Sequence, residues 1–250
     1  MSAESSLEES LKKQRKASLR QIVWRNVQAA VWQALEGVFV LATYRIKYGR
    51  YDLVKYISHL DMLKLFARAS RRCELPVAYS EGFNPHPLFV FGMPIPVGTT
   101  SEDEYVDITL TEKMETLEII NRLNSAMPEA VRILDARLLP EKAPNIMKSI
   151  VASRYRVTAA LSSEDIEHIL KEASGTEPLI VDKHTKSGTR PTDVRPMIFD
   201  VHIEGEQVFV TTAAGNENNL RPELALSALA GRKVAVHTIH RLALLTEEEL

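Results

Sequence analysis

The sequence has little cysteine, few aromatic residues and no long uninterrupted apolar run, and each shortage excludes a class of protein. Cys73 is the single cysteine among 250 residues, so this chain cannot form an internal disulfide, a four-cysteine zinc site or an iron–sulfur cluster. Aromatic residues make up 6% and the formal net charge is -2, so any nucleic-acid binding has to come from a local patch. The remaining composition is that of a globular protein, for which a reducing, cytoplasmic location is expected.

The most apolar long stretch, residues 23–42, does not predict a membrane span. Polar residues interrupt it, and Arg25 and Glu36 are both costly in a bilayer core. The pattern from about Leu7 to Ala42 instead predicts an amphipathic helix, with lysines and arginines in its first part. Residues 1–42 are therefore interpreted as a helical extension without a targeting signal, packed or solvated, and membrane-surface binding is the less favoured alternative.

Residues 43–140 predict the element order β-α-β-β-α-β. Tyr44, Ile46 and Tyr48 alternate with polar residues as in a strand, and Ser58 followed by Asp61 resembles a helix capping box. Further strands and a helix over roughly 114–127 complete the order, which is that of a ferredoxin-like unit. The inward side of the second helix is assigned to Leu117, Ile120, Leu123 and Met127.

Residues 138–152 predict a linker, after which a similar but degraded order of elements follows. A strand at Arg154–Leu161, a helix after Ser162, a polar loop at His184–Pro196, a hairpin and a helix near Pro222 precede a last strand. The predicted fold class is α+β, with two tandem ferredoxin-like (βαββαβ) units behind an N-terminal helical extension. The predicted domains are residues 1–42, 43–140 and 150–245.

The helix that starts near Ser58 combines an apolar side with a cationic side. Its inward side is assigned to Leu60, Leu63, Phe66, Ala67 and Cys73. Four cations fall within about a 100° arc of the same helix, and Arg45 on the preceding strand adds to them: Lys64, Arg68, Arg71 and Arg72. Residues 41–88 carry eight Lys/Arg against four Asp/Glu, whereas residues 101–141 carry four against ten. This segregation favours either a phosphate-binding ridge or an ordinary solvated face.

The loop Glu81–Pro87, with sequence EGFNPHP, is the most specific local feature. Its two prolines and its glycine restrict the backbone to a compact shape. Phe83, Asn84 and His86 are candidates for stacking on unpaired bases beside the cationic helix. The alternative is that Phe83 fills the core and the prolines only terminate a strand.

Two further groups are weaker candidates. Lys183, Arg190 and Arg195 gather around the polar loop and predict either a second phosphate contact or a flexible charged loop. His59, close to Tyr56 and Lys55, is either the general base of an RNA endonuclease or a surface histidine at a helix start. His237 and His240 do not share a strand face, and the sequence shows no third ligand for them, so no metal site is predicted.

The motifs YISHLD at 56–61, RRCELP ending at Pro76, AYSEGFNPHP ending at Pro87, PIPVG ending at Gly98 and EYVD at 104–107 resemble a known bacterial family. This family is the radical SAM-linked domain of unknown function, which occurs alone or fused to cobalamin-binding radical SAM proteins. The resemblance covers roughly residues 43–245 and implies a radical SAM protein as partner. The chain itself lacks the three cysteines that hold a radical SAM cluster, and no cofactor is predicted for it.

Three functions follow as hypotheses. The leading one is a non-catalytic RNA-binding or substrate-presenting module that acts with a radical SAM protein and uses the cationic helix and the proline loop. The second is a metal-independent RNA endonuclease with His59 as base, and the third is a protein-interaction scaffold. No membrane partner is expected.

Overall fold

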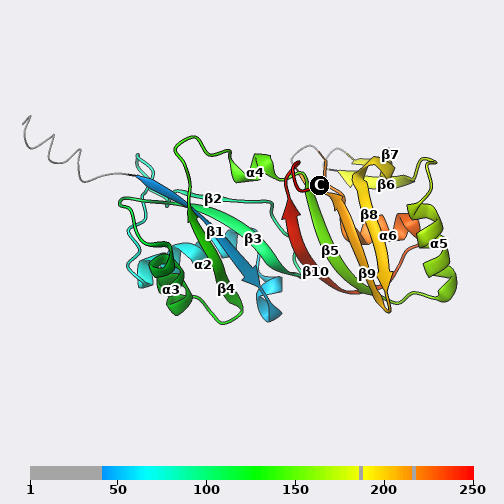
Figure 1. Ribbon diagram of the computed structural model, residues 1–250, viewed down its shortest axis with the longest axis horizontal. Coiled ribbons are helices and arrows are strands. Elements are labelled where there is room, and N and C mark those ends of the chain that lie inside the picture. Colours follow the sequence, from blue (N-terminus) through cyan, green and yellow to red (C-terminus); the bar gives the residue numbers. More distant parts are fainter. Residues whose placement is uncertain (1–40, 186–187, 216–217) are drawn as a thin grey trace, which may run out of the picture.

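The computed structural model describes residues 41–185, 188–215 and 218–250, which form a mixed α+β fold (Figure 1). Its main sheet has eight strands in the order β4-β1-β3-β10-β5-β9-β8, with β2 also paired to β3. Five α-helices lie within the described residues. The helix predicted for residues 1–42 lies outside the described residues except at its end, where Ala42 already belongs to the first strand.

The first half runs β-α-β-β-α-β along the chain, and all its strand pairs are antiparallel. Alternating apolar residues on its strands face two amphipathic helices, which explains why this part of the sheet is covered on one side. Its elements are β1 (Ala42–Arg50), the 3₁₀-helix η1 (Asp52–Tyr56), α2 (His59–Arg72), β2 (Phe89–Phe91), β3 (Thr99–Leu110), α3 (Thr116–Ala126) and β4 (Val131–Leu138).

The second half has the same order of elements around an inserted hairpin, which forms a separate two-stranded sheet. Its main strands pair in the order β10-β5-β9-β8, again antiparallel. Its elements are α4 (Ile146–Ser149), β5 (Ala152–Ala159), α5 (Ser163–Ala173), β6 (Ile180–Thr185), β7 (Gly188–Asp193), the 3₁₀-helix η2 (Arg195–Met197), β8 (Ile198–Glu204), β9 (Gln207–Ala213), α6 (Pro222–Leu229) and β10 (Val236–Leu245).

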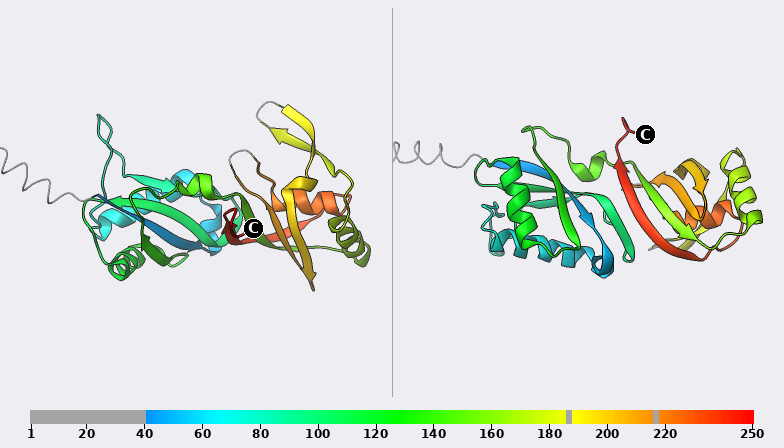
Figure 2. Two further views of the ribbon diagram at one scale, coloured as in Figure 1. Left: turned by 45° about the horizontal axis from the view of Figure 1, so that its top comes forward. Right: turned by 60° about the horizontal axis from the view of Figure 1, so that its bottom comes forward.

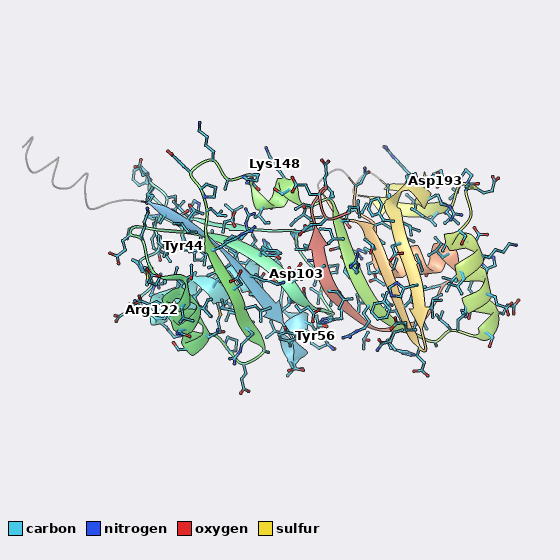
Figure 3. The ribbon with its side chains drawn as sticks, viewed as in Figure 1. Tyr44, Tyr56, Asp103, Arg122, Lys148 and Asp193 are labelled. Atoms are coloured by element: carbon cyan, nitrogen blue, oxygen red, sulfur yellow. The ribbon has the colours of Figure 1, made fainter. Side chains whose placement is uncertain are left out.

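The last strand joins the two halves. β10 runs parallel to the first residues of β3 through three residue pairs, while β2 pairs with residues further along β3. Asp103, labelled in Figure 3, reinforces this junction. Its carboxylate accepts a hydrogen bond from the Leu244 amide at 2.6 Å and forms an ion pair with the Lys47 ammonium at 2.8 Å. The two halves therefore lie side by side in one sheet, as Figures 1 and 2 show.

Each half has its own hydrophobic core. In the first, Phe66 of α2 and Leu123 of α3 pack on β1 and β3, and in the second, Ile169 of α5 and Leu226 of α6 pack on β5 and β9. A third, smaller cluster lies under α4 and includes Ile146 and Leu244. These clusters fix the helices on the sheet and so decide which helix faces meet solvent.

The predicted helix starts are confirmed, but two predicted core positions are wrong. The Ser58 hydroxyl accepts a hydrogen bond from the Asp61 amide, and Ser162 and Asp165 form a complete capping box. Leu60 and Leu117, which the spacing places inward, are each 66% exposed. At 100° per residue, Leu60 lies about 160° from Met62 and Leu117 about 160° from Ile119, so both are on the side of their helix that faces away from the core. The true inward sides use Met62, Phe66 and Ala69 in α2, and Ile119 and Leu123 in α3.

Candidate functional site

The outward side of α2 carries the four predicted cations. Lys64, Arg68, Arg71 and Arg72 are all exposed, on the opposite side from the buried residues of the helix. Lys64 lies 3.4 Å from the Asp61 carboxylate, and the Arg72 guanidinium donates to the Ala126 carbonyl. Arg68 and Arg71 form no ion pair or side-chain hydrogen bond with the part of the chain that the structure describes. Their charges are therefore available to a partner. We call these four residues the α2 ridge.

The proline loop, defined here as residues 80–87, is closed at its base and open at its tip. The Ser80 amide donates to the His86 carbonyl at 2.9 Å, and the Ser80 hydroxyl lies 2.8 Å from His86 Nδ1. Gly82 has φ +116°, which side-chain-bearing residues rarely adopt. Phe83 is fully exposed, so the alternative in which it fills the core is wrong. Asn84 and His86 are exposed as well.

The α2 ridge and the proline loop lie at the same end of the first half. Residues 73–79 connect them, and an extended chain of seven residues spans at most about 25 Å. In Figure 2, left, the loop projects from this end of the sheet as a teal arm beyond the neighbouring elements. The first half thus carries exposed cations and one exposed aromatic ring on consecutive segments of the chain.

Arg45, which the sequence assigns to the same cationic surface, does not belong to it. Its side chain is 6% exposed and forms a bidentate pair with Asp107, with Nε and Nη2 at 2.8 and 2.9 Å from the two carboxylate oxygens. Its Nη2 also donates to the Pro144 carbonyl. Arg45 is buried because its side chain points to the side of the sheet that is covered by α4 and the segment before it. Arg45 is therefore a structural residue, and its prediction as an RNA contact is wrong.

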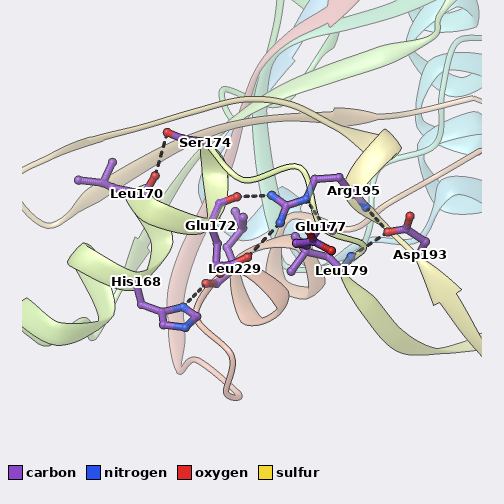
Figure 4. Close-up of polar contacts among 9 residues, drawn as sticks. All are labelled: His168, Leu170, Glu172, Ser174, Glu177, Leu179, Asp193, Arg195 and Leu229. Carbon is purple, nitrogen blue, oxygen red and sulfur yellow. Dashed lines mark hydrogen bonds and ion pairs between the residues drawn. The ribbon is translucent and has the colours of Figure 1, made fainter.

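Arg195 is also engaged within the protein (Figure 4). Its guanidinium pairs with the Glu172 carboxylate at 2.9 Å and donates to the carbonyls of Glu172 and Glu177. It joins the end of α5 to η2, so its donors are already used within the protein, and its role as a phosphate contact stays a prediction. Residues 184–196 are not a simple loop, because β6 and β7 pair as a hairpin in which Lys183 lies opposite Arg190. Arg190 is exposed.

His59 is the first residue of α2. Its ring packs edge-on against Phe91, with centroids 5.3 Å apart, and it is half-buried. Within the described residues, no side chain forms a hydrogen bond with it. Tyr56 instead points to solvent under the Lys55 ammonium. The role of His59 as a general base stays a prediction.

The junction of the two halves contains a buried polar network that the sequence analysis does not identify. Arg241 of β10 is 1% exposed, and its Nη1 donates to Glu104 at 2.8 Å and to the Met93 carbonyl at 3.2 Å. Its Nη2 donates to the Tyr155 hydroxyl at 3.2 Å. Burial by itself lowers the pKa of Arg241, but the attraction of Glu104 and Tyr155 outweighs it and the net pKa is raised. Arg241 is therefore charged and holds the two halves together.

A second buried arginine lies next to this pair. Arg50, at the end of β1, is 3% exposed and donates to the carbonyls of Val54 and Ile57. Arg50, His59 and Glu104 line a small cavity of about 10 Å³, roughly the space of one water. Burial, with Glu104 as a second cause, raises the pKa of the Tyr48 phenol, which lines the same cavity.

This network brings together parts of three sequence motifs. His59 belongs to YISHLD, Glu104 to EYVD, and the loop at Pro94 and Ile95 to PIPVG, and all of them line the small cavity. The sequence offers no local signal for this network, because the Arg241–Glu104 pair joins residues that are 137 positions apart. Among the described residues no group of three or more His, Cys, Asp or Glu has the spacing of a metal site. The described helices also include none long and apolar enough to cross a bilayer.

The order and pairing of the elements define a mixed α+β protein built from two β-α-β-β-α-β halves that share one sheet. A bacterial family described as "Uncharacterized protein conserved in bacteria (DUF2344)" matches residues 43–222, and the chain belongs to this family. The match agrees with the prediction of a bacterial family of unknown function. The link of that family to radical SAM proteins stays a prediction.

Similarity to other known proteins is distant. A chain of the Cbf5-Nop10-Gar1 complex matches with 13% identity and a TM-score of 0.40, over 79% of this chain and 47% of that chain, so this chain spans about half its length. An unknown protein from Galdieria sulphuraria matches with 14% identity and a TM-score of 0.25, over 81% of this chain and 99% of that chain. No curated protein matches. These likenesses support no argument about function.

Proposed function

We propose that this protein is a non-catalytic RNA-binding module that docks single-stranded RNA on the α2 ridge and the proline loop. The observation that carries the proposal is the combination of Arg68 and Arg71, exposed without partners among the described residues, with the fully exposed ring of Phe83 at the same end of the domain. Burying an aromatic ring is favourable, so a fully exposed one on a braced loop favours a surface that meets a partner.

The chemistry of RNA matches these groups. Guanidinium groups form charge-assisted hydrogen bonds with phosphates, and an aromatic face stacks on an unpaired base. The hydrogen bonds between Ser80 and His86 fix the conformation of the proline loop before RNA binds, which lowers the conformational entropy lost on binding. The strand order in each half supports the interpretation of the protein as two ferredoxin-like units. Such a fold can present binding residues on its loops and helices.

We propose further that the module presents its RNA to a protein partner, a radical SAM protein according to the family resemblance. An exposed apolar patch supports a protein contact at the opposite end of α2, around η1. Its residues are Leu53 at 78% exposure, Tyr56 at 60%, Leu60 at 66% and Val97 at 61%. The Gly98 amide donates to the Lys55 carbonyl, which holds the loop after β2 against η1.

The proposal is tested by fluorescence anisotropy with a labelled single-stranded RNA and the full chain. Binding is expected to weaken steeply as salt rises, because cations released from the RNA drive it. The double variant Arg68→Glu/Arg71→Glu should bind at least about tenfold more weakly. Phe83→Ala should lose about tenfold with little change in the salt slope, because stacking is not ionic.

A matched control reverses two cations elsewhere on the surface. Arg132 and Arg137 are exposed on β4, and Arg132→Glu/Arg137→Glu makes the same change in net charge. RNA affinity within about threefold of the wild type is expected for this control. Equal losses in both double variants, or no loss in the α2 variant, would overturn the proposal. The RNA should also be recovered intact in EDTA, and cleavage that disappears in His59→Ala would favour the endonuclease instead.

A further inference from the structure

A groove lies where the described chain begins, on the side of the sheet away from α2 and α3. Its volume is about 790 Å³. Thr43, Asp107 and Thr109 line it and alternate with core residues along β1 and β3, so their side chains point away from the two helices. Residues of the segment 138–145, which leads to α4, also line it. We call this hollow the entry groove, because Leu41, the first described residue, is part of its lining.

The apolar residues of the entry groove are left uncovered by the described part of the protein. Leu41 is 61% exposed, Val90 of β2 is 40% exposed and Leu138 of β4 is 44% exposed. Pro140 and Pro144 of the same lining are exposed as well. Exposed apolar side chains that gather in one hollow favour a contact with another apolar surface, because burying them is favourable.

The charged residues of the entry groove nearly cancel one another. Asp107 is paired with Arg45, so Lys113 and Glu141 remain, with one charge of each sign. A surface with no excess of one charge does not attract RNA or an anionic membrane. The groove therefore fits an occupant that is apolar on one side and close to neutral.

The chain before Leu41 has this character. At 100° per residue, five apolar residues of the segment 23–40 fall within an arc of about 80°. They are Trp24, Val27, Val31, Leu35 and Val38. The charged residues of this segment are Arg25 and Glu36, which also cancel.

We propose that residues 23–40 of this chain pack their apolar side in the entry groove. Residue 40 is bonded directly to Leu41, so the segment meets the groove at an effective concentration of about the millimolar order of short linkers. A contact of modest affinity then keeps the groove filled. The groove is on the other side of the sheet from the α2 ridge, so this contact leaves the proposed RNA surface open and does not depend on it.

Tryptophan fluorescence of the full chain tests the proposal, because both tryptophans of the protein, Trp24 and Trp32, lie in this segment. Acrylamide should quench them at least about twofold less in the native chain than in the urea-unfolded chain, since packing shields an indole ring from the quencher. Val90→Glu and Leu138→Glu should each raise quenching toward the unfolded value, because a charge in the groove opposes burial of the apolar segment.

The matched control is Leu170→Glu. Leu170 is also 44% exposed but lies on α5 of the second half, so this change should leave quenching as in the wild type. Within the segment, Val31→Gln should act like the groove variants, whereas Gln33→Glu, on the polar side, should not. Far-UV circular dichroism and urea midpoints establish that each variant is folded.

Three results would overturn the proposal. The first is native tryptophans as accessible to acrylamide as those of the unfolded chain. The second is quenching in Val90→Glu and Leu138→Glu that equals quenching in Leu170→Glu. The third is quenching that rises on dilution, with a dimer in light scattering, which would assign the groove to the segment of a second copy.

Discussion

Strand β1 and helix α2 are neighbours in the sequence and both are rich in cations, but the structure uses those cations in opposite ways. Arg45 and Arg50 of β1 are buried and bonded to the protein, whereas Arg68 and Arg71 of α2 face solvent without partners among the described residues. The strand is central in a sheet with helices on one side and α4 with its connecting segment on the other. The helix has the sheet on one side only.

This difference shows that a cationic residue in the sequence does not by itself indicate an exposed binding surface. A cation on a central strand serves the fold when the other elements supply a carboxylate or carbonyl for it, as Asp107 does for Arg45. A cation on the outer side of a helix stays solvated at little cost and keeps its charge for a partner. Three ion pairs of decreasing burial allow this comparison to be tested.

The largest effect is expected for Arg241→Ala. This change leaves Glu104 buried without its partner, and it should lower the free energy of unfolding by about 3–5 kcal/mol. Urea denaturation followed by circular dichroism measures it. Arg68→Ala is the matched control on α2 and should stay within about 0.5 kcal/mol of the wild type. Similar losses in the two variants would break the comparison between strand and helix.

A pair of intermediate burial is Asp165 with Arg232, where the carboxylate is buried and the guanidinium half-exposed. The Arg232 guanidinium, with the Ser162 amide and hydroxyl, holds the pKa of Asp165 well below its usual range. A lowered pKa in the folded state contributes stability above the unfolded value near about pH 4 and loses it as the pH falls further. Asp165→Asn should therefore be less stable than the wild type at pH 7, with a difference that shrinks below about pH 4.

Urea midpoints at several pH values between 7 and 3 measure this difference. Arg232→Gln removes the other partner and should reproduce most of the loss at pH 7. A loss that is the same at pH 3 and pH 7 would show that packing of Asp165, and not its charge, stabilises the start of α5.

The smallest effect is expected for Lys64→Ala, which removes the exposed pair with Asp61. Exposed pairs contribute little, so the free energy of unfolding should change by less than about 0.5 kcal/mol, and this difference should shrink at high salt, which screens exposed charges. The measurement is again a urea titration, at low and at high salt. A cost above about 1 kcal/mol would mean that the α2 ridge stabilises the fold, which would weaken its assignment as a docking surface.

Local signals in the sequence predict much of the fold and part of the site. Alternation predicted β1 and β3, and Ser58 and Ser162 marked helix starts, because a cap depends on residues only three apart. The exposure of the α2 ridge also followed from helical spacing. The β8–β9 hairpin was predicted too, and Gly205, with φ +58°, lies in its turn.

Other parts of the site depended on contacts between distant segments. Leu60 and Leu117 were predicted inward because the apolar spacing of these helices is compatible with more than one inward side, and only packing on the sheet selects it. Arg45 and Arg195 were predicted as phosphate contacts because nothing near them in the sequence reveals Asp107 or Glu172 as partners. The sequence predicts a strand over 178–183, which agrees with β6, and a polar loop over 184–196, where Gly188–Asp193 instead form the short, polar strand β7.

The sequence by itself determined the order of the main strands and helices of each half, the two capped helices, the cationic side of α2 and the proline-restricted loop, because each depends on interactions within a few residues. Only the tertiary structure decided that β10 pairs with β3, that Arg241 meets Glu104 and that the entry groove lies beside the start of β1. The physical reason is that burial and pairing depend on which distant segments cover a residue, and local spacing does not contain that information.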